Sequence, residues 1–371
     1  MTRLLLAGGG HAHVEVLRRF ARRPLPAVEV VVIVPDTGLL YSGMVPGVIA
    51  GWYAIGDATI DIVALAQAAG ARLIVGAVAA FDANRRRATL ADGTAIDFDV
   101  ASLNVGAMTH VAMASTDARV VPVRPLTGLL AAWAGTRDEA ARGLMGALAV
   151  VGGGAAGVEI AFAMAHRLHA DLGARAPHVT IVTDEGEIAA QQPAGVRRRL
   201  ARLLAARSIA VVAGSAAQAI DAAGIVLAER RHVPADRVII ATPAVAAPWL
   251  RASGLACDHD GFVCVDAFLR SPSHPAVFAA GDCATQIDAP RPRSGVYAVR
   301  AGPALAENLR RAVGGEPLAP YRPQRTALAL ISTGDRYAVA SRPPWSAEGK
   351  WVWWWKDRVD RGFVARYRVP R

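Results

Sequence analysis

The clearest structural signal in this chain is the run Ala147-Leu148-Ala149-Val150-Val151-Gly152-Gly153-Gly154-Ala155-Ala156-Gly157. Its five leading apolar residues predict a buried strand over 147–151, and the sequence that follows predicts a helix over 155–169. The glycines between them complete a GxGxxG pattern in the strand–turn–helix context that this pattern requires. A second strand is predicted over 178–183, so the region contains a βαβ unit.

This glycine turn indicates a dinucleotide site, because backbone N–H groups and the helix N-terminus can approach a pyrophosphate there. Glu159 follows near the positive end of the helix dipole and is a candidate for stabilising that end or for reaching nicotinamide or ribose. Asp184 follows the second strand, where an acid binds a free ribose 2′-hydroxyl and favours NADH. NADPH stays open as the alternative, because three arginines lie at 197–199. The candidate contacts are Gly152, Gly154, Ala155, Ala156, Gly157, Glu159 and Asp184.

A similar unit begins near the N-terminus. An apolar strand is predicted over 3–7, a helix over 13–22 and a second strand over 29–34, with Gly8-Gly9-Gly10-His11-Ala12-His13 at the turn. His13 stands where the third glycine is expected, and the strand ends at Val34 instead of at an acid. We therefore assign the ribose contact to Asp36, two residues later, and the pyrophosphate contacts to the glycine turn.

A third motif is Val277-Phe278-Ala279-Ala280-Gly281-Asp282-Cys283-Ala284, in which a buried strand ends in Gly-Asp. A carboxylate at this place can accept a hydrogen bond from a ribityl hydroxyl, although an aspartate at the end of a strand is also common in ordinary turns. Combined with two dinucleotide turns, it indicates FAD. We predict an α/β fold with two Rossmann-like domains: an FAD-binding domain over 1–115 and 245–318, an inserted NAD(P)H-binding domain over 116–244, and a C-terminal region over 319–371.

The order of GGGHAH (8–13), GGGAAGVE (152–159) and FAAGDCA (278–284) resembles the FAD-dependent pyridine nucleotide-disulfide oxidoreductase superfamily across almost the whole chain. Within it the sequence resembles the type II NADH dehydrogenase branch. The segments YSGMVPGVIAGWY, SLNVG, GVYAVRAGPALAENL, STGDRYAVASR and WVWWWKDRVDRGF are similar to the flavoprotein module that is fused N-terminally to selenophosphate synthetase.

The resemblance implies which residues contact the cofactors. Gly295, Val296 and Tyr297 would lie beside the isoalloxazine, at the start of a helix predicted over 295–313. Pro243 stands where many relatives have glycine, and it removes a backbone donor from the nicotinamide side. The implied FAD contacts are Gly8, Gly10, His11, Ala12, Asp36, Ser42, Gly43, Val78, Gly106, Gly281, Asp282, Gly295, Val296 and Tyr297.

The segment 41–46 lies where the disulfide reductases of this superfamily carry their redox cysteines, and it contains no thiol. The three cysteines lie far from it in sequence and show no metal-ligand spacing. We therefore expect hydride transfer from nicotinamide to FAD and then to a quinone or other small acceptor, without a redox-active disulfide. The catalytic candidates are Tyr41, Ser42, Met44, Tyr297 and Arg300. The alternative is a redox partner or sensor of low turnover in selenium metabolism.

The 41 Lys and Arg residues against 31 Asp and Glu give a net charge of +10. Nearly all of the basic residues are arginine in an alanine-rich chain, so we attribute the excess to composition and expect no nucleic-acid partner. The few cysteines and the lack of a leader pattern predict a cytoplasmic protein, and a homodimer is a further expectation.

The tail gathers Trp351, Trp353, Trp354 and Trp355 among basic residues. Val352, Trp355, Val359 and Phe363 fall near helical spacing, which predicts an amphipathic helix. Interfacial tryptophans with basic neighbours favour peripheral contact of 350–364 with the inner face of the cell membrane. The alternative is packing of this helix on the FAD domain or at a dimer interface.

Overall fold

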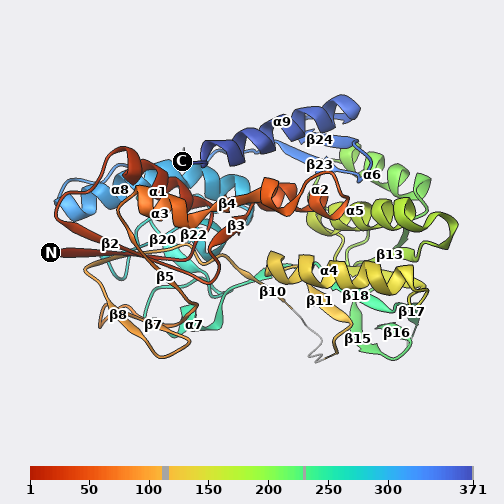
Figure 1. Cartoon of the computed structure of the whole chain (residues 1–371), viewed down its shortest axis with the longest axis horizontal. Helices are drawn as coiled ribbons and strands as arrows, with labels where there is room; N and C mark the ends of the chain where they lie inside the picture. The colour runs from red at the N-terminus through yellow and green to blue at the C-terminus, as the bar shows by residue number, and fades with distance from the viewer. Residues whose placement is uncertain (111–116, 229–230, 370–371) are drawn as a thin grey trace.

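The computed structural model describes residues 1–110, 117–228 and 231–369. Two five-stranded parallel sheets form the two halves of the molecule, each flanked by helices (Figure 1). This arrangement confirms the predicted α/β fold with two Rossmann-like units. The boundary predicted at 115/116 lies outside the described residues.

The first sheet has the strand order β21-β9-β1-β2-β5. Its central strand β1 pairs in parallel with β2 and β9, and every residue from Leu4 to Ala7 is fully buried because helices cover both faces. Strand β21 joins this sheet although it follows the second sheet in sequence, which makes the second unit an insertion. The strands are β1 (Thr2–Ala7), β2 (Val28–Val34), β5 (Arg72–Val75), β9 (Val100–Leu103) and β21 (Val277–Ala279).

The second sheet has the order β11-β18-β12-β13-β14. Here β12 pairs in parallel with β13 and β18, so the βαβ unit that begins at Ala147 is confirmed. The strands are β11 (Val120–Pro122), β12 (Ala147–Val151), β13 (His178–Val182), β14 (Ala210–Val212) and β18 (Arg237–Ile240).

The long helices pack on these sheets close to their predicted limits. Helix α1 starts at His11, two residues earlier than predicted, and packs against α8. Helix α5 runs three residues further than predicted and contacts α2 of the other half. The helices are α1 (His11–Arg22), α2 (Val45–Ile49), α3 (Ile62–Ala68), α4 (Leu126–Ala141), α5 (Ala155–Leu172), α6 (Ala194–Ala206), α7 (Pro248–Arg251) and α8 (Gly295–Gly314).

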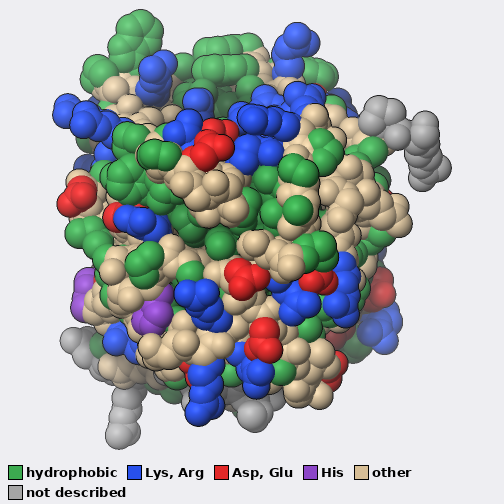
Figure 2. All heavy atoms as spheres, turned by 90° about the vertical axis from the view of Figure 1, so that its left-hand side faces the viewer, with side chains coloured by type: hydrophobic (Ala, Val, Ile, Leu, Met, Phe, Trp, Pro, Cys, Tyr) green, Lys and Arg blue, Asp and Glu red, His purple; other side chains and the backbone are tan. Residues whose placement is uncertain are grey.

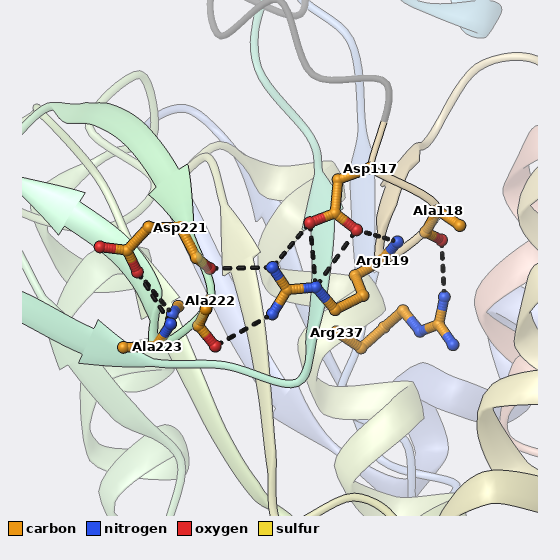
Figure 3. A network of polar contacts seen from close by, with 8 residues as sticks. Asp117, Ala118, Arg119, Asp221, Ala222, Ala223 and Arg237 are labelled. Atoms are coloured by element: carbon orange, nitrogen blue, oxygen red, sulfur yellow. Dashed lines mark hydrogen bonds and ion pairs between the residues drawn. The ribbon is translucent and has the colours of Figure 1, made fainter.

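A three-stranded meander is attached to each half. The first contains a hairpin with its turn at 91–94, between β7 and β8. The sequence analysis did not identify the second. There the Arg119 guanidinium binds the Asp117 carboxylate and the carbonyls of Asp221 and Ala222, which ties the meander to the segment before β11 (Figure 3). The strands are β6 (Val78–Asp82), β7 (Arg87–Leu90), β8 (Ala95–Asp97), β15 (Ala217–Asp221), β16 (Gly224–Leu227) and β17 (His232–Pro234).

The chain returns from the second half to the first through an antiparallel pair, β10 with β19. The His110 N–H donates to the Pro243 carbonyl, so the proline without a donor serves here as an acceptor. The remaining short elements are β3 (Gly38–Leu40), β4 (Thr59–Asp61), β10 (Met108–Thr109), β19 (Ala244–Val245), β20 (Val263–Val265), β22 (Ala284–Gln286), η1 (Ser42–Met44), η2 (Ile55–Ala58), η3 (Gly173–Arg175) and η5 (Gly281–Cys283).

The C-terminal region forms an antiparallel sheet of β23 (Ala329–Ser332), β24 (Ala338–Arg342) and β25 (Trp345–Gly349), followed by α9 (Lys350–Arg366). Helix α9 lies along the top of the molecule in Figure 1. The helix was predicted correctly, but the apolar face assigned to it was wrong. Val352 and Phe363 are buried, whereas Trp355 and Val359 are 41% and 47% exposed. The buried face of the helix instead includes Trp353 and two charged residues, Lys356 and Asp360.

Positive charge is distributed over the molecule together with acidic partners. On the face shown in Figure 2, basic side chains are interspersed with acidic and apolar ones. Glu15, for example, pairs with both Arg18 and Arg19 on α1. In the described part of the chain, no helix has both the length and the apolar character needed to cross a membrane.

Candidate functional site

A cavity of about 2670 Å³ extends between the two halves of the molecule. Both glycine turns line it, and so do segments of the C-terminal region. Among the predicted contacts, the cavity lining includes Gly8, Gly10, His11, Asp36, Tyr41, Ser42, Gly43, Val78, Gly106, Asp282, Gly295, Val296 and Arg300, and on the other side Gly152, Gly154, Ala155, Ala156, Glu159, Asp184 and Pro243. The fold thus brings together most residues that the motifs singled out.

The N-terminal glycine turn lies directly against the end of β9. Gly8 has a φ of +95°, and a Cβ on it would lie 2.5 Å from the Asn104 carbonyl oxygen. The buried Asn104 side chain accepts the N–H groups of Ala12 (3.0 Å) and His13 (3.2 Å) and donates to the Ala280 carbonyl (2.6 Å). Asn104 therefore joins the first turn to the Gly281-Asp282 motif. Sequence reasoning missed it, although a polar residue directly after a buried strand was a usable signal.

His13 explains how the turn tolerates a large residue in place of glycine. Its Nδ1 lies 2.6 Å from the Gly8 carbonyl and its Nε2 lies 2.8 Å from the Ser102 hydroxyl. Since a carbonyl only accepts, Nδ1 carries the proton and Nε2 accepts from Ser102. Burial lowers the pKa of His13 to about 4, so the ring is neutral and holds the turn through two hydrogen bonds.

His11 has an incomplete hydrogen-bond environment at the cavity. Its Nε2 atom is buried and has no partner among the described residues, and burial lowers its pKa to about 4. Tyr41 meets the ring edge-on at 5.6 Å, and Phe363 of α9 lies 6.0 Å away. An unsatisfied buried nitrogen beside a cavity fits a polar ligand at this place.

Asp282 faces the same cavity from η5. Burial raises the pKa of its carboxyl, while the nearby guanidinium groups of Arg124 and Arg293 oppose this rise. The Arg124 guanidinium lies 3.4 Å from the carboxylate. Sequence analysis did not identify Arg124, because it belongs to the segment between β11 and α4 and reaches the motif only in the folded chain.

The second glycine turn repeats the geometry of the first. Gly152 has a φ of +125°, and a Cβ on it would lie 2.3 Å from the Ala241 carbonyl oxygen at the end of β18. No side chain caps the N-terminus of α5, which leaves its first N–H groups available to an anion. Asp184 and Glu185 line the cavity after β13. The arginines at 197–199 do not line it: Arg197 pairs with Glu187, and Arg199 pairs with Glu348.

Several predicted contacts lie behind the cavity wall. Met44 is fully buried, and the N–H of Ala12 is already bonded to Asn104. Gly157 packs against the Gly152 carbonyl. Gly281 and Tyr297 line a separate cavity of about 60 Å³. These five positions are therefore placed to support the site instead of forming the surface of the large cavity.

A group of charged side chains closes the cavity on the side of the C-terminal region. Lys356 of α9 donates to the Gly43 carbonyl (2.6 Å) and to Asp360 (2.6 Å), and both side chains are buried. Glu159 accepts the Ser332 N–H at 2.7 Å. It lies in the second turn of α5. The sequence did not single out Lys356 as a buried residue, because nothing in the local pattern shows which side of α9 is covered.

The three cysteines lie away from this cavity. Cys283 is fully buried, Cys257 and Cys264 are half-buried, and none of them belongs to the cavity lining. Burial raises the pKa of all three thiols, that of Cys283 to about 11, which keeps them in the unreactive thiol form.

The residues present fit two dinucleotides. Each glycine turn lies so close to a neighbouring strand that a side chain at Gly8 or Gly152 would collide with backbone. The uncapped start of α5 supplies N–H donors for a phosphate, and the orphaned His11 Nε2 can form a hydrogen bond with a polar cofactor atom. The two turns share one cavity, so ligands on both can meet in it.

Comparisons with known proteins agree with this geometry. Residues 2–302 match the family model described as pyridine nucleotide-disulphide oxidoreductase. A search among curated proteins gave no match. Among solved structures, the sulfide:quinone oxidoreductase from Aquifex aeolicus has a TM-score of 0.80 at 18% identity, over 99% of this chain and 92% of that chain.

Two further structures share the fold. A ferredoxin reductase from Rhodopseudomonas palustris has a TM-score of 0.75 at 21% identity, over 92% of this chain and 82% of that chain. The water-forming NADH oxidase from Lactobacillus brevis has a TM-score of 0.72 at 18% identity, over 92% and 75%. The matched family model covers most of the chain and both glycine turns. The chain therefore belongs to the pyridine nucleotide-disulphide oxidoreductase family, whose members are FAD-dependent NAD(P)H oxidoreductases.

Proposed function

We propose that this protein oxidises NADH and passes the electrons by way of FAD to a quinone or similar small apolar acceptor, without a redox-active disulfide. The observation that carries this proposal is the continuous cavity, which extends from both glycine turns to a partly apolar wall in the C-terminal region. A dinucleotide at each turn and an acceptor at that wall would share one continuous space.

The N-terminal half would hold FAD. When bound, this cofactor supplies the chemistry of accepting a hydride and passing electrons onward. The chain's own groups would fix its position: the first glycine turn near the pyrophosphate, Asp36 at the ribose, Asp282 at the ribityl chain, and the start of α8 near the ring system. Ser42 lies beside that start, since a Cβ on Gly295 would lie 3.3 Å from the Ser42 hydroxyl.

NADH is favoured over NADPH by the charges around the second turn. Asp184 and Glu185 present carboxylates to the cavity, where a free 2′-hydroxyl can donate and a phosphate would be repelled. The arginines at 197–199, which are the alternative site for a 2′-phosphate, do not line the cavity. Arg197 and Arg199 form ion pairs with Glu187 and Glu348 instead. Replacing Asp184 with Ala should therefore weaken the binding of NADH more than the binding of NADPH. An equal loss of affinity for both nucleotides would count against this assignment.

The acceptor would lie against the C-terminal region. Leu328, Leu330 and Ile331 line the cavity on one side, and α9 adds Trp355, Val359 and Phe363. Such a wall suits an apolar ring better than a charged acceptor. Arg300 is exposed at the same cavity and is the candidate for a hydrogen bond to a quinone oxygen.

We further propose that α9 brings the cavity to a membrane surface. Trp351, Trp354 and Trp355 are 58%, 57% and 41% exposed, on the side of the helix opposite its buried face. Exposed tryptophans beside Lys350 and Arg358 suit the headgroup region of an anionic bilayer. An apolar acceptor dissolved in that bilayer would then reach the cavity directly.

The test is anaerobic stopped-flow spectroscopy of the purified protein with its flavin. Adding NADH should bleach the flavin absorbance, and adding duroquinone afterwards should restore it. Flavin that stays oxidised after prolonged incubation with NADH and with NADPH would overturn the proposed function. Flavin that is reduced but not reoxidised by the quinone would overturn the choice of acceptor.

A further inference from the structure

The cavity wall formed by the C-terminal region carries positive charge beside its apolar side chains. Arg342, the last residue of β24, and Arg358 of α9 both line the cavity, and both are exposed. Neither side chain has an ion pair or a hydrogen bond to any residue that the structure describes. On another side of the same helix, Arg361 is by contrast paired with Asp357 at 2.9 Å. The wall therefore carries two arginines whose charge has no acidic partner.

The register of β24 sets the direction of Arg342. Successive side chains of a strand point to opposite faces of the sheet. Ser341 faces the inserted half, where its hydroxyl donates to Gln192 Oε1 at 2.7 Å. Arg342 therefore projects from the opposite face, which it shares with Ala340. Since Ala340 pairs with Leu330 of β23, Arg342 lies on the same side of the sheet as this residue of the apolar wall.

The acids at this end of the cavity have other partners. Asp360 accepts a hydrogen bond from Lys356 at 2.6 Å. Glu159 accepts the Ser332 N–H at 2.7 Å, and burial raises its pKa to about 7, which weakens its negative charge at neutral pH. In the described part of the chain, no other carboxylate of the cavity lining comes from α5, α9 or the C-terminal sheet. The wall itself therefore supplies no anion for the two arginines.

The two dinucleotides would place their own charges elsewhere. The NADH diphosphate would lie at the start of α5 in the inserted half, from which Arg342 is turned away. The FAD diphosphate would lie at the first glycine turn. The end of α9 is close to that turn, since the Phe363 ring lies 6.0 Å from the His11 ring. Arg366, which also lines the cavity, is nearer to this end of α9 than Arg358. Arg342 and Arg358 are therefore left for a third anionic group.

We propose that the acceptor is a quinonoid ring with an acidic substituent, such as a carboxylate, sulfonate or phosphate. The ring would lie on Leu328 and Leu330, and the anion would bind Arg342 and Arg358. Charge on the wall of a cavity attracts an opposite charge more strongly than it does in open water. The substituent stays ionised and is not consumed: NADH + H⁺ + quinone gives NAD⁺ + quinol. This inference rests on the proposed function and names the class of its acceptor.

The test compares two acceptors that share a ring and differ in charge: 1,4-naphthoquinone and 1,4-naphthoquinone-2-sulfonate. The flavin is first reduced anaerobically with NADH in lipid-free buffer, and stopped-flow reoxidation then gives a second-order rate constant for each quinone. In the wild type the constant for the sulfonate should fall as salt is raised to about 0.5 M, because salt screens the attraction between charges. The constant for the neutral ring should change much less.

Two variants remove the charges one at a time. In Arg342→Gln and in Arg358→Gln, the ratio of the sulfonate constant to the neutral constant should fall roughly 10-fold, which corresponds to the loss of one charged hydrogen bond. The ratio cancels the difference in intrinsic reactivity between the two quinones. The matched control is Arg198→Gln, which should keep the wild-type ratio. Arg198 is also exposed, but it lies on α6 outside the cavity lining.

A binding measurement gives a readout without NADH or turnover. Equilibrium dialysis of anthraquinone-2-sulfonate against the oxidised flavoprotein yields a Kd. This Kd should rise roughly 10-fold in Arg342→Gln and in Arg358→Gln and keep the wild-type value in Arg198→Gln. An unchanged Kd or an unchanged rate ratio in both cavity variants would overturn the inference.

An anionic lipid headgroup offers the same chemistry as an acidic acceptor, and phosphatidylglycerol vesicles distinguish the two. If the cavity variants bind these vesicles more weakly but keep the wild-type ratio and Kd in lipid-free buffer, the arginines serve headgroups and the inference is overturned. A wild-type flavin that neither NADH nor NADPH reduces would instead overturn the proposed function. The dialysis would then still decide whether the cavity binds an acidic ring.

Discussion

The raised pKa of Glu159 makes a quantitative prediction about stability. An ordinary glutamate has a pKa of 4.5, and burial raises that of Glu159 to about 7. Each pH unit of this rise corresponds to about 1.4 kcal/mol, which gives an upper limit of about 3 kcal/mol. The carboxyl group faces a cavity that water can enter, so screening reduces the effect, and we expect about 1 to 2 kcal/mol.

The sign follows from proton binding. The folded state holds the Glu159 proton more tightly than the unfolded state, so its contribution to stability is complete below pH 4.5 and is lost as pH rises through about 7. Glutamine cannot ionise and loses nothing over this range. The variant Glu159→Gln should therefore gain about 1 to 2 kcal/mol relative to the wild type between about pH 5 and about pH 8.5.

Calorimetry of both proteins over this pH range is the assay. A chain of 371 residues has an unfolding entropy of about 0.8 kcal/mol/K, so the Tm difference should change by about 2 °C. Asp171→Asn on the same helix is the control: burial raises the pKa of Asp171, but Arg167 and Arg137 more than offset this rise, so the net shift is downward. The contribution of Asp171 is therefore complete throughout this pH range, and the Tm difference of that variant should not change with pH. A Tm difference between Glu159→Gln and the wild type that does not change with pH would refute the reasoning.

Three other outcomes are expected. Gly8→Ala should lose bound FAD, seen as a lower ratio of flavin to protein absorbance, whereas Gly93→Ala should keep it, because both glycines have a positive φ but only Gly8 lacks space. Asn104→Ala should lower the free energy of unfolding by about 2 to 4 kcal/mol in urea titrations, since two buried N–H groups and a carbonyl lose their partner; a loss below about 0.5 kcal/mol would contradict this role. Replacing Trp351 and Trp354 with Ser should move the protein from the pellet to the supernatant in sedimentation with anionic liposomes, and unchanged sedimentation would argue against membrane contact.

The motifs predicted the framework of this protein well. Each glycine turn follows a buried strand and precedes a helix, and such local patterns arise from backbone geometry that neighbouring residues set. The helix predicted over 295–313 matches α8 to within one residue, and the Gly281-Asp282 motif joins the first sheet as expected. The domain limits, the acceptor, the homodimer and the link to selenium metabolism remain predictions.

The sequence did not reveal the side chains that act across the fold. Asn104 and Arg124 reach the Gly281-Asp282 motif from segments more than 150 residues away, and no local pattern marks that contact. The meander of β15, β16 and β17 escaped notice because its strands are short and partly exposed. Such strands lack the apolar runs or regular alternation that identify a strand.

The C-terminal helix shows most clearly what the sequence determines and what only the tertiary structure decides. Helical periodicity determined that residues near 350–364 form a helix and which of them share a side. Periodicity does not determine which side the rest of the chain covers, and here β24, β25 and the N-terminal half cover the side with Lys356 and Asp360. By itself the sequence therefore determined the two nucleotide-binding units, because their geometry is local. Only the tertiary structure decided that Lys356 and Asp360 are buried next to Glu159, because that burial depends on packing between segments some 200 residues apart.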